Sequence, residues 1–365
     1  MHFSERFGEF EITESFICRE ILLLLQRTYE DINCKQYTLY NKRYKEIRKS
    51  IEPLITMENN YYATINTAVE RLNSQEFDGK LTHKGRDGEP YPSINALYDF
   101  IHLCRSVIFP GFYGSSIVNN QTFNYHIGVR VEKLFNILTE QLYAGLCFEC
   151  NEEDRRLELK KQRSMEIAAN FIEQLPEIKL ILRTDVEAIY NGDPAAKNFG
   201  EIILAYPGLK AIVNYRIAHA LLKLGASDII PRMITEMAHS ETGIDIHPGA
   251  TIGSYFAIDH GTGIVIGETC IIGNHVKLYQ GVTLGAKSFP TDENNNPIKG
   301  IARHPILEDN VIVYAGATIL GRITIGEGVV IGGNEWVTVG RVRNSAIKRE
   351  QSQTCLNYAE REQNH

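Results

Sequence analysis

The residues best suited to catalysis are histidines, carboxylates and one arginine in the C-terminal third of this 365-residue chain. Asp245, Asp259 and His260 stand close together in the sequence, and Arg303 and His304 follow further along. A histidine beside a carboxylate is the simplest general base, because the carboxylate fixes the imidazole tautomer and stabilises the charged form. An arginine adds a planar fork that binds a carboxylate. These residue types suit proton abstraction next to an anion-binding group.

Each of these residues also has a purely structural interpretation. Aspartate and histidine are common at the turns of repetitive folds, and Arg303 is compatible with a surface charge. Asp193, which precedes a proline, has the form of a helix N-cap. A metal site built on His247, His260 and His304 is a further alternative, but their spacing shows no evident ligand triad. We therefore predict no metal.

A six-residue repeat must position the candidate residues. Six residues do not return to the same face of an α-helix, but they fit short strands with one inward side chain each. Such repeats predict a parallel β-helix, in which three hexads form one triangular coil. The repeated aliphatic residues, with one shift of two and one long interruption, are Ile246, Ile252, Ile258, Ile264, Ile266, Ile272, Leu278, Leu284, Leu307, Val313, Ile319, Ile325, Ile331 and Val337.

A polar segment, residues 286–305, interrupts the repeat. It is rich in asparagine and proline, so we expect a loop that leaves one corner of the solenoid. Asp259 and His260 stand at a corner, and Arg303 and His304 mark the place where the loop rejoins the repeat. Both pairs of residues can meet at one edge if the loop folds back.

The chain before the repeats carries helical patterns. We expect breaks at Pro176 and Gly225, and an N-cap at Asp193 after the Asn191-Gly192 end of a helix. The expected helices are 11–40, 59–72, 91–107, 126–144, 151–174, 201–224 and 231–239, with a polar loop at 75–92. The sequence thus predicts an α+β protein: an all-helical N-terminal domain (1–240), a parallel β-helix (241–342) and a tail (343–365).

Composition narrows the function classes. A net charge of −7 argues against general nucleic-acid binding. The 7 cysteines are odd in number and dispersed, and Cys147 and Cys150 lack the second pair expected of a zinc site. We find no apolar run of membrane length and no secretory signal at the N-terminus, so we expect a cytoplasmic protein that binds no membrane. The exposed faces of a short solenoid also predict self-association.

Several motifs resemble serine O-acetyltransferase, a family of hexapeptide-repeat acyltransferases. The most specific are Asp259-His260-Gly261-Thr262-Gly263 and Arg303-His304-Pro305. The resemblance covers about residues 100 to 340, and its motifs lie at 105–114, 192–196, 206–208, 215–219, 242–253, 258–269, 281–285 and 303–305. It implies a left-handed β-helix and transfer of an acetyl group from acetyl-CoA to L-serine, the entry to cysteine synthesis.

The resemblance also implies roles for single residues. His260 is expected to act as the general base, oriented by Asp245, so that the serine hydroxyl attacks acetyl-CoA directly and no acyl-enzyme forms. His304 completes the pocket and assists catalysis. Asp193 and Asp259 are expected to bind the serine ammonium group.

The remaining implied roles concern binding of the serine carboxylate, binding of acetyl-CoA and assembly of the chain with itself or with a partner. Arg303 is expected to bind the serine carboxylate. Acetyl-CoA is expected in a groove between neighbouring solenoids, near Gly285, Ala286 and Ala315, within a homotrimer or hexamer. Familiar members end in an isoleucine that inserts into cysteine synthase, whereas this sequence ends in His365, so the resemblance does not extend to that partner. Inhibition by cysteine, a close analogue of serine, is also implied.

Two other functions fit parts of the sequence. Another hexapeptide-repeat acyltransferase, acting on an amino sugar or another small acceptor, would need neither Asp193 nor Arg303. A scaffold that only binds a partner would have no use for both His260 and Asp245.

Overall fold

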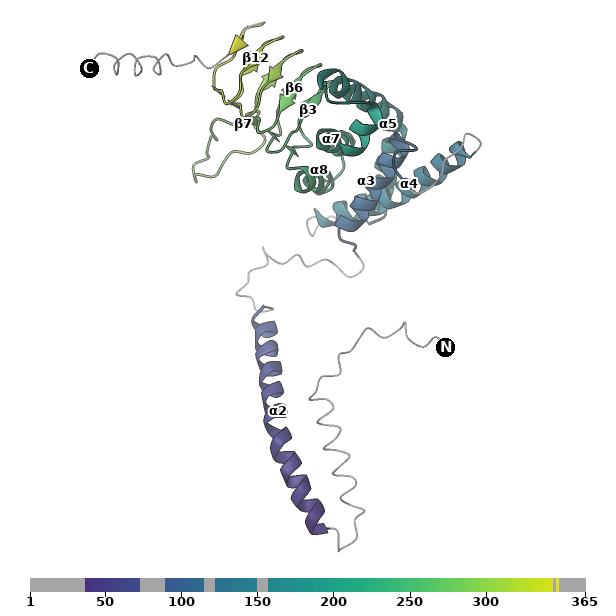
Figure 1. The fold of residues 1–365 in the computed structure, drawn as a ribbon, viewed down its shortest axis with the longest axis vertical. Coiled ribbons are helices and arrows are strands. Elements are labelled where there is room, and N and C mark those ends of the chain that lie inside the picture. Colours follow the sequence, from purple (N-terminus) through teal and green to yellow (C-terminus); the bar gives the residue numbers. More distant parts are fainter. Residues whose placement is uncertain (1–36, 73–88, 115–121, 150–156, 344–345, 348–365) are drawn as a thin grey trace, which may run out of the picture. The chain divides into compact units, whose positions relative to one another are not determined.

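The computed structural model describes residues 37–72, 89–114, 122–149, 157–343 and 346–347 (Figure 1). The chain divides into two compact units, Met1–Lys84 and Gly85–His365. Most of the expected helix at 11–40 and of the polar loop at 75–92 lies outside the described residues. In the first unit, α2 spans Tyr37–Leu72 with Pro53 inside it, so the helix expected at 59–72 begins much earlier.

The second unit begins with a helical part, and its pattern was largely predicted. The helices are α3 (Ile94–Ile108), α4 (Phe123–Phe148), α5 (Leu157–Gly192), α6 (Phe199–Ala205), α7 (Pro207–Lys223) and α8 (Ile229–Thr242). Two expectations were wrong. Pro176 does not break α5, whose side chains are buried on both sides of the proline. Residues 201–224 form two helices, because Tyr206 is extended before Pro207, which occupies the first turn of α7.

The described strands of the second unit form a left-handed parallel β-helix, the yellow-green stack in Figure 1. All fourteen repeated aliphatic side chains are buried, which confirms the hexad prediction. The strands are β1 (Asp245–Ile246), β2 (Thr251–Ile252), β3 (Ala257–Asp259), β4 (Val265–Ile266), β5 (Ile271–Ile272), β6 (Lys277–Tyr279), β7 (Thr283–Gly285), β8 (Ile306–Leu307), β9 (Ile312–Val313), β10 (Thr318–Leu320), β11 (Thr324–Ile325), β12 (Val330–Ile331), β13 (Trp336–Val337) and β14 (Ala346–Ile347).

The strands form three parallel sheets, one on each side of the triangular coil. The first sheet has the order β1-β4-β7-β10-β13, the second β11-β8-β5-β2, and the third β14-β12-β9-β6-β3. We call the turn from the third sheet to the first the 3/1 corner, and the turn from the first sheet to the second the 1/2 corner. The segment 286–305 leaves the solenoid between β7 and β8, at the 1/2 corner, as expected.

A buried ion pair joins the helices to the first coil of the solenoid. Arg216 of α7 donates to both carboxylate oxygens of Asp185 of α5, each at 3.1 Å. The same guanidinium donates to the carbonyls of Ile252 and Gly253, both at 2.6 Å, and Asp185 accepts the backbone N–H of Phe256 at 3.0 Å. Both side chains are almost completely buried. The pair therefore satisfies strand ends that the solenoid cannot pair itself.

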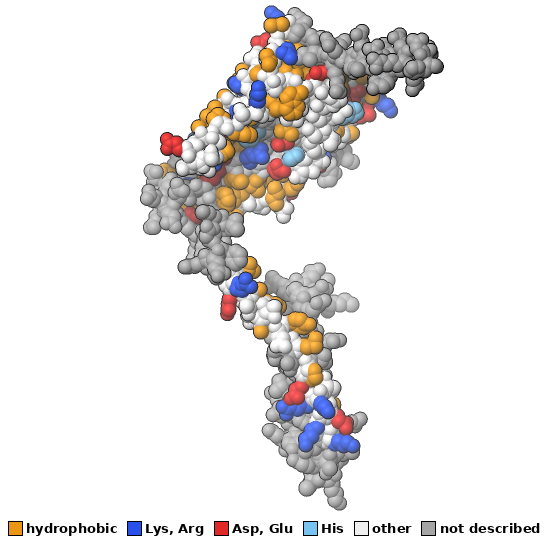
Figure 2. Space-filling view, turned by 90° about the vertical axis from the view of Figure 1, so that its left-hand side faces the viewer, with side chains coloured by type: hydrophobic (Ala, Val, Ile, Leu, Met, Phe, Trp, Pro, Cys, Tyr) orange, Lys and Arg blue, Asp and Glu red, His pale blue; other side chains and the backbone are white. Residues whose placement is uncertain are grey.

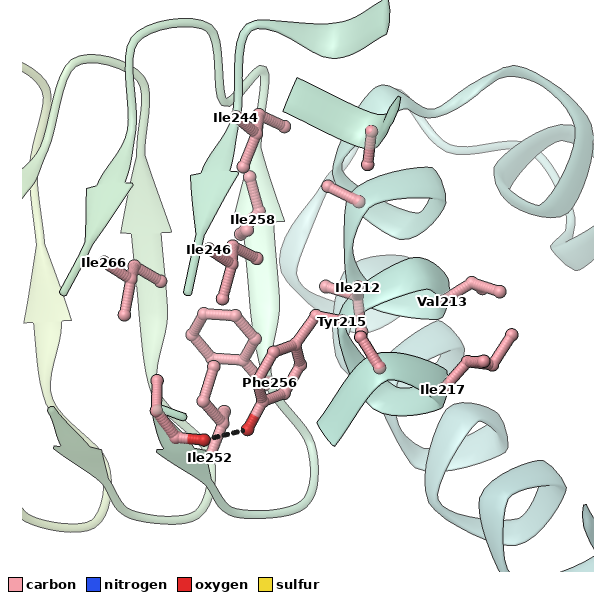
Figure 3. Close-up of a cluster of buried hydrophobic side chains, with 14 of the residues drawn as sticks. Ile212, Val213, Tyr215, Ile217, Ile244, Ile246, Ile252, Phe256, Ile258 and Ile266 are labelled. Carbon is pink, nitrogen blue, oxygen red and sulfur yellow. Dashed lines mark hydrogen bonds between the residues drawn. The ribbon is translucent and has the colours of Figure 1, made fainter. Parts of the chain in front are cut away.

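An apolar cluster joins α7 to the first coils of the solenoid (Figure 3). Tyr215 of α7 points toward Phe256 and Ile252 of the first coil, and its hydroxyl donates to the carbonyl of Ala250 at 2.6 Å, the dashed line in Figure 3. The helical part and the solenoid thus share one continuous core. The change from helix to strand after Thr242 lies close to the predicted domain boundary, and the division into domains at 240 stays a prediction.

Replacement of Asp185 by Ala should lower the free energy of unfolding by about 3–5 kcal/mol, because it leaves the Arg216 cation buried without a carboxylate. Urea unfolding measures this change. Glu187→Ala is the control on the same helix, since it breaks only an exposed pair with Arg183 and should cost less than about 1 kcal/mol. Equal losses in the two variants would contradict the proposed importance of the buried pair.

Candidate active site

The first group of candidate residues gathers at the 3/1 corner. Asp259 ends β3, and His260 follows in the turn with a left-handed φ of 57°. Its Nε2 lies 3.6 Å from Asp259 Oδ1, and its side chain is 77% exposed. Tyr255 and His275 have similar φ values at another corner, so this backbone form belongs to the solenoid turns. The exposed, carboxylate-paired imidazole is what suits His260 to proton transfer.

Asp193 lies in the loop between α5 and α6 and faces the same corner. Its Oδ1 accepts the N–H of Ala195 at 2.8 Å, and its Oδ2 accepts the hydroxyl of Tyr206 at 2.7 Å. These hydrogen bonds, that of Tyr206 first, lower the pKa of Asp193. The expected N-cap role was wrong, because Asn198 caps α6. The ionised Asp193 carboxylate is available to a cation.

Lys277 also belongs to this corner, and the sequence reasoning missed it. Its Nζ lies 2.9 Å from Asp259 Oδ2 and donates to the carbonyl of Gly192 at 2.8 Å. Lys277 pairs in register with Ala257 of β3, and Asp259 pairs with Tyr279, so Lys277 reaches Asp259 diagonally from the next coil. Asp193, Tyr206, Asp259 and Lys277 line one small pocket.

The second group gathers at the 1/2 corner, around a buried histidine. The backbone N–H of Thr269 donates to His304 Nδ1 at 3.0 Å, and the Thr269 hydroxyl lies 2.9 Å from the same nitrogen. An N–H group cannot accept a hydrogen bond, so Nδ1 is unprotonated and the neutral ring carries its proton on Nε2. A Cβ on Gly267 would lie 2.1 Å from the His304 ring, so only glycine fits beneath it. His304 is thereby held as a hydrogen-bond donor.

Arg303 is already paired in this structure. Its Nη2 donates to Glu268 Oε2 at 2.9 Å, and the guanidinium is about a quarter exposed. The sequence reasoning missed Glu268. Arg303 and Glu268 also line a pocket with Phe289, Ile298 and neighbouring residues of the 286–305 segment. The arginine fork therefore stands at the edge of an open pocket.

The two groups do not meet within one chain, so the expectation of a common edge was wrong. Asp259 and His260 turn from the third sheet to the first, whereas Arg303 and His304 enter the second sheet. The 286–305 segment returns to the corner it left, because β8 must pair in register with β5 of the coil below. The first sheet separates the two groups. Figure 2 shows acidic, basic and histidine side chains close together on one face of the chain.

The remaining predicted residues are also distributed over both corners. Asp245 begins β1 at the 3/1 side of the first sheet. Burial lowers the pKa of the nearby His247, and the charge of Asp245 only partly opposes this shift. Among the described residues, no hydrogen bond or ion pair joins Asp245 to His260. Gly285 and Ala286 lie at the end of β7 on the 1/2 side, whereas Ala315 lies in the turn before β10 on the 3/1 side.

The part of the chain that the structure describes holds no group of three or more His, Cys, Asp or Glu side chains arranged to bind a metal. In the same residues, no helix is both long and apolar enough to cross a membrane.

The stability of the fold should depend on the protonation of His304. Burial first, and then the charge of Arg303, lowers its pKa to about 4, from an ordinary value of about 6.5. Between these two pH values the unfolded chain therefore binds a proton that the folded chain does not. The contribution of His304 to the free energy of unfolding is complete above pH ~6.5 and is lost as the pH falls toward ~4. Between pH 7 and pH 5, the urea midpoint of the wild type should fall further than that of His304→Asn. An equal fall in both proteins would contradict the buried neutral imidazole.

Known proteins share both parts of this structure. A family model described as "Serine acetyltransferase, N-terminal" matches residues 136–214. A plasmid-encoded serine acetyltransferase of Synechococcus elongatus is 48% identical over 265 residues, which are 72% of this chain and 83% of that protein. The serine acetyltransferase of Bacillus subtilis is 47% identical over 152 residues, and these cover 65% of its length.

The solved structures agree with the sequence comparisons. The crystal structure of Entamoeba histolytica serine acetyltransferase 1 in complex with L-cysteine has a TM-score of 0.60 and 34% identity to this chain, and the match covers 80% of this chain and 99% of that one. The native form of the same enzyme gives a TM-score of 0.59. The chain belongs to the serine acetyltransferase family.

Proposed function

We propose that this chain transfers the acetyl group of acetyl-CoA to the hydroxyl of L-serine, and releases CoA and O-acetyl-L-serine. Family membership over most of the chain supports this reaction. The observation that carries the proposal is the set of polar groups at the two corners. An exposed imidazole stands among carboxylates at one corner, and an arginine beside a neutral histidine stands at the other. Serine needs a base, an anion for its ammonium group and a cation for its carboxylate.

The base in this mechanism is His260. It removes the proton from the serine hydroxyl as the oxygen attacks the thioester carbonyl of acetyl-CoA. The tetrahedral intermediate collapses, and the imidazolium returns the proton to the departing CoA sulfur. Asp245 orients His260 in this proposal, and the adjacent Asp259 stabilises the imidazolium. No acyl-enzyme is needed, since the hydroxyl attacks directly.

Charged groups at both corners hold the serine. Asp193 and Asp259 bind the ammonium group, which replaces Lys277 on Asp259. Arg303 binds the serine carboxylate, which replaces Glu268 on the guanidinium. His304 donates its Nε2 proton to the substrate, because Thr269 occupies Nδ1. Each substrate charge thus exchanges with a charge of the same sign already present.

The complete site forms between two copies of the chain. The 3/1 corner supplies His260, and the 1/2 corner of a neighbour supplies Arg303 and His304. In a closed ring, one surface patch of each copy contacts a different patch of the next copy, and the two separate corners provide such a pair of patches. Exposed Val265 and Trp336 on the first sheet offer apolar area for this contact. A homotrimer is the simplest such ring, and a hexamer would pair two of them.

Acetyl-CoA lies in the groove between the copies in this arrangement. Gly285 and Ala286 line it from the 1/2 corner of one copy, and Ala315 lines it from the 3/1 corner of the other. The reaction takes place in the cytoplasm, with no metal. L-Cysteine, which is bound in the crystal structure of the Entamoeba histolytica enzyme, inhibits by competing with serine in the same pocket.

Replacement of His260 by Ala should lower turnover by ~10²-fold or more, the usual scale for loss of a general base. The measurement is CoA thiol release from acetyl-CoA, with and without L-serine, alongside the mass of the oligomer. His275→Ala is the control, since that histidine stacks on Tyr255 at another corner. Serine-dependent release in wild type and in His275→Ala, lost only in His260→Ala, is expected. Near-normal release by His260→Ala would remove this residue from the mechanism.

A further inference from the structure

A second polar cavity lies in the helical part, between α3, α7 and α8. Its volume is about 250 Å³, and none of the residues assigned to acetyl transfer lines it. The lining residues are Tyr98, Asp99, Ile101, His102, Arg105, Asn214, Met237 and Glu241. Arg105 begins the 105–114 motif, to which the proposed acetyl transfer gives no role.

Arg105 places a positive charge in this cavity, and no carboxylate of the described part of the chain forms an ion pair with it. Its Nη2 donates to Asn214 Oδ1 at 2.9 Å, and Asn214 in turn donates to the carbonyl of Ile234 at 3.0 Å. Among the described residues, its buried Nε has no hydrogen-bond partner. Burial lowers the pKa of Arg105, although the nearby Tyr113 and Glu241 act in the opposite direction. A desolvated guanidinium with open donors favours an anionic ligand.

The carboxylates of the cavity make a simple anion a poor fit. Glu241 is held by Lys210 at 2.5 Å, which leaves it partly neutralised. Asp99 lies six residues before Arg105 on α3 and lines the same cavity, and no ion pair joins the two within the described residues. The cavity therefore carries a cation and, separated from it, a carboxylate. Phosphate would satisfy Arg105 but would be repelled by Asp99 and Glu241.

A zwitterion matches this distribution of charge. In an α-amino acid the ammonium and carboxylate groups are attached to one carbon. With a charge-assisted hydrogen bond of about 2.8 Å at each end, such a molecule can bridge a protein cation and a separate protein carboxylate. The buried side chains of Ile101 and Met237, together with the ring of Tyr98, give the same cavity apolar walls. We propose that this cavity binds an α-amino acid with an apolar side chain, its carboxylate on Arg105 and its ammonium group toward Asp99.

Calorimetric titration of the full-length protein with L-methionine tests this site. The wild type is expected to bind, and Arg105→Gln to bind about tenfold or more weakly, because a charge-assisted hydrogen bond is lost. Arg183→Gln is the matched control, since this arginine lies on α5 and pairs with Glu187. L-Methioninamide, which lacks the carboxylate, and N-acetyl-L-methionine, which lacks the ammonium group, should each bind much more weakly than L-methionine.

Further variants distinguish this cavity from the serine pocket. Arg303→Ala should leave the affinity for L-methionine unchanged, and Asp99→Asn, at an exposed position, should weaken it even if Arg105→Gln does not fold. Absence of binding to the wild type would overturn the proposal. So would equal affinity for L-methioninamide, or a loss of affinity in Arg303→Ala that Asp99→Asn does not show.

Discussion

Packing of the inward apolar side chains of the hexads is the interaction on which this structure depends. Stacked in parallel register, these side chains form the core of the solenoid, and they leave the corners free to carry polar groups. The same core continues into the helices through Tyr215 and Phe256, with Arg216 and Asp185 satisfying the open strand ends beside it. Rigid coils thus fix the height and direction of every candidate catalytic side chain.

The charges of the candidate site are arranged for exchange with a zwitterion. Lys277 already lies against Asp259, and Glu268 lies against Arg303, so both groups that we propose to bind serine are paired in this structure. Such pairs reduce the desolvation cost of holding an unoccupied charge, while each partner remains accessible enough to be displaced. The neutral His304 adds a donor without a further charge, because Thr269 and the close contact with Gly267 fix its ring.

Much of this could be predicted from the sequence, since the hexad period is local and its fourteen inward positions are all buried. Helix boundaries were less predictable. Buried side chains on both sides of Pro176 keep α5 continuous despite the helix-breaking tendency of proline, whereas Pro207 begins a new helix. The candidate residues were named, but their distribution over two corners was not foreseen. It depends on which strand follows the 286–305 segment, and composition does not encode that pairing. Lys277 and Glu268 escaped notice because their partners are separated in sequence by a coil or by the loop.

In the proposed site, His260 of one copy works with Arg303 of another. The most direct measurement is serine-dependent CoA release by oligomers reassembled from equal amounts of His260→Ala and Arg303→Ala chains, each nearly inactive alone. A shared site predicts recovery to about a quarter of wild-type activity, because about one interface in four then receives both intact residues. Activity no higher than that of the separate variants, in confirmed mixed oligomers, would contradict the account and place the whole site within one chain.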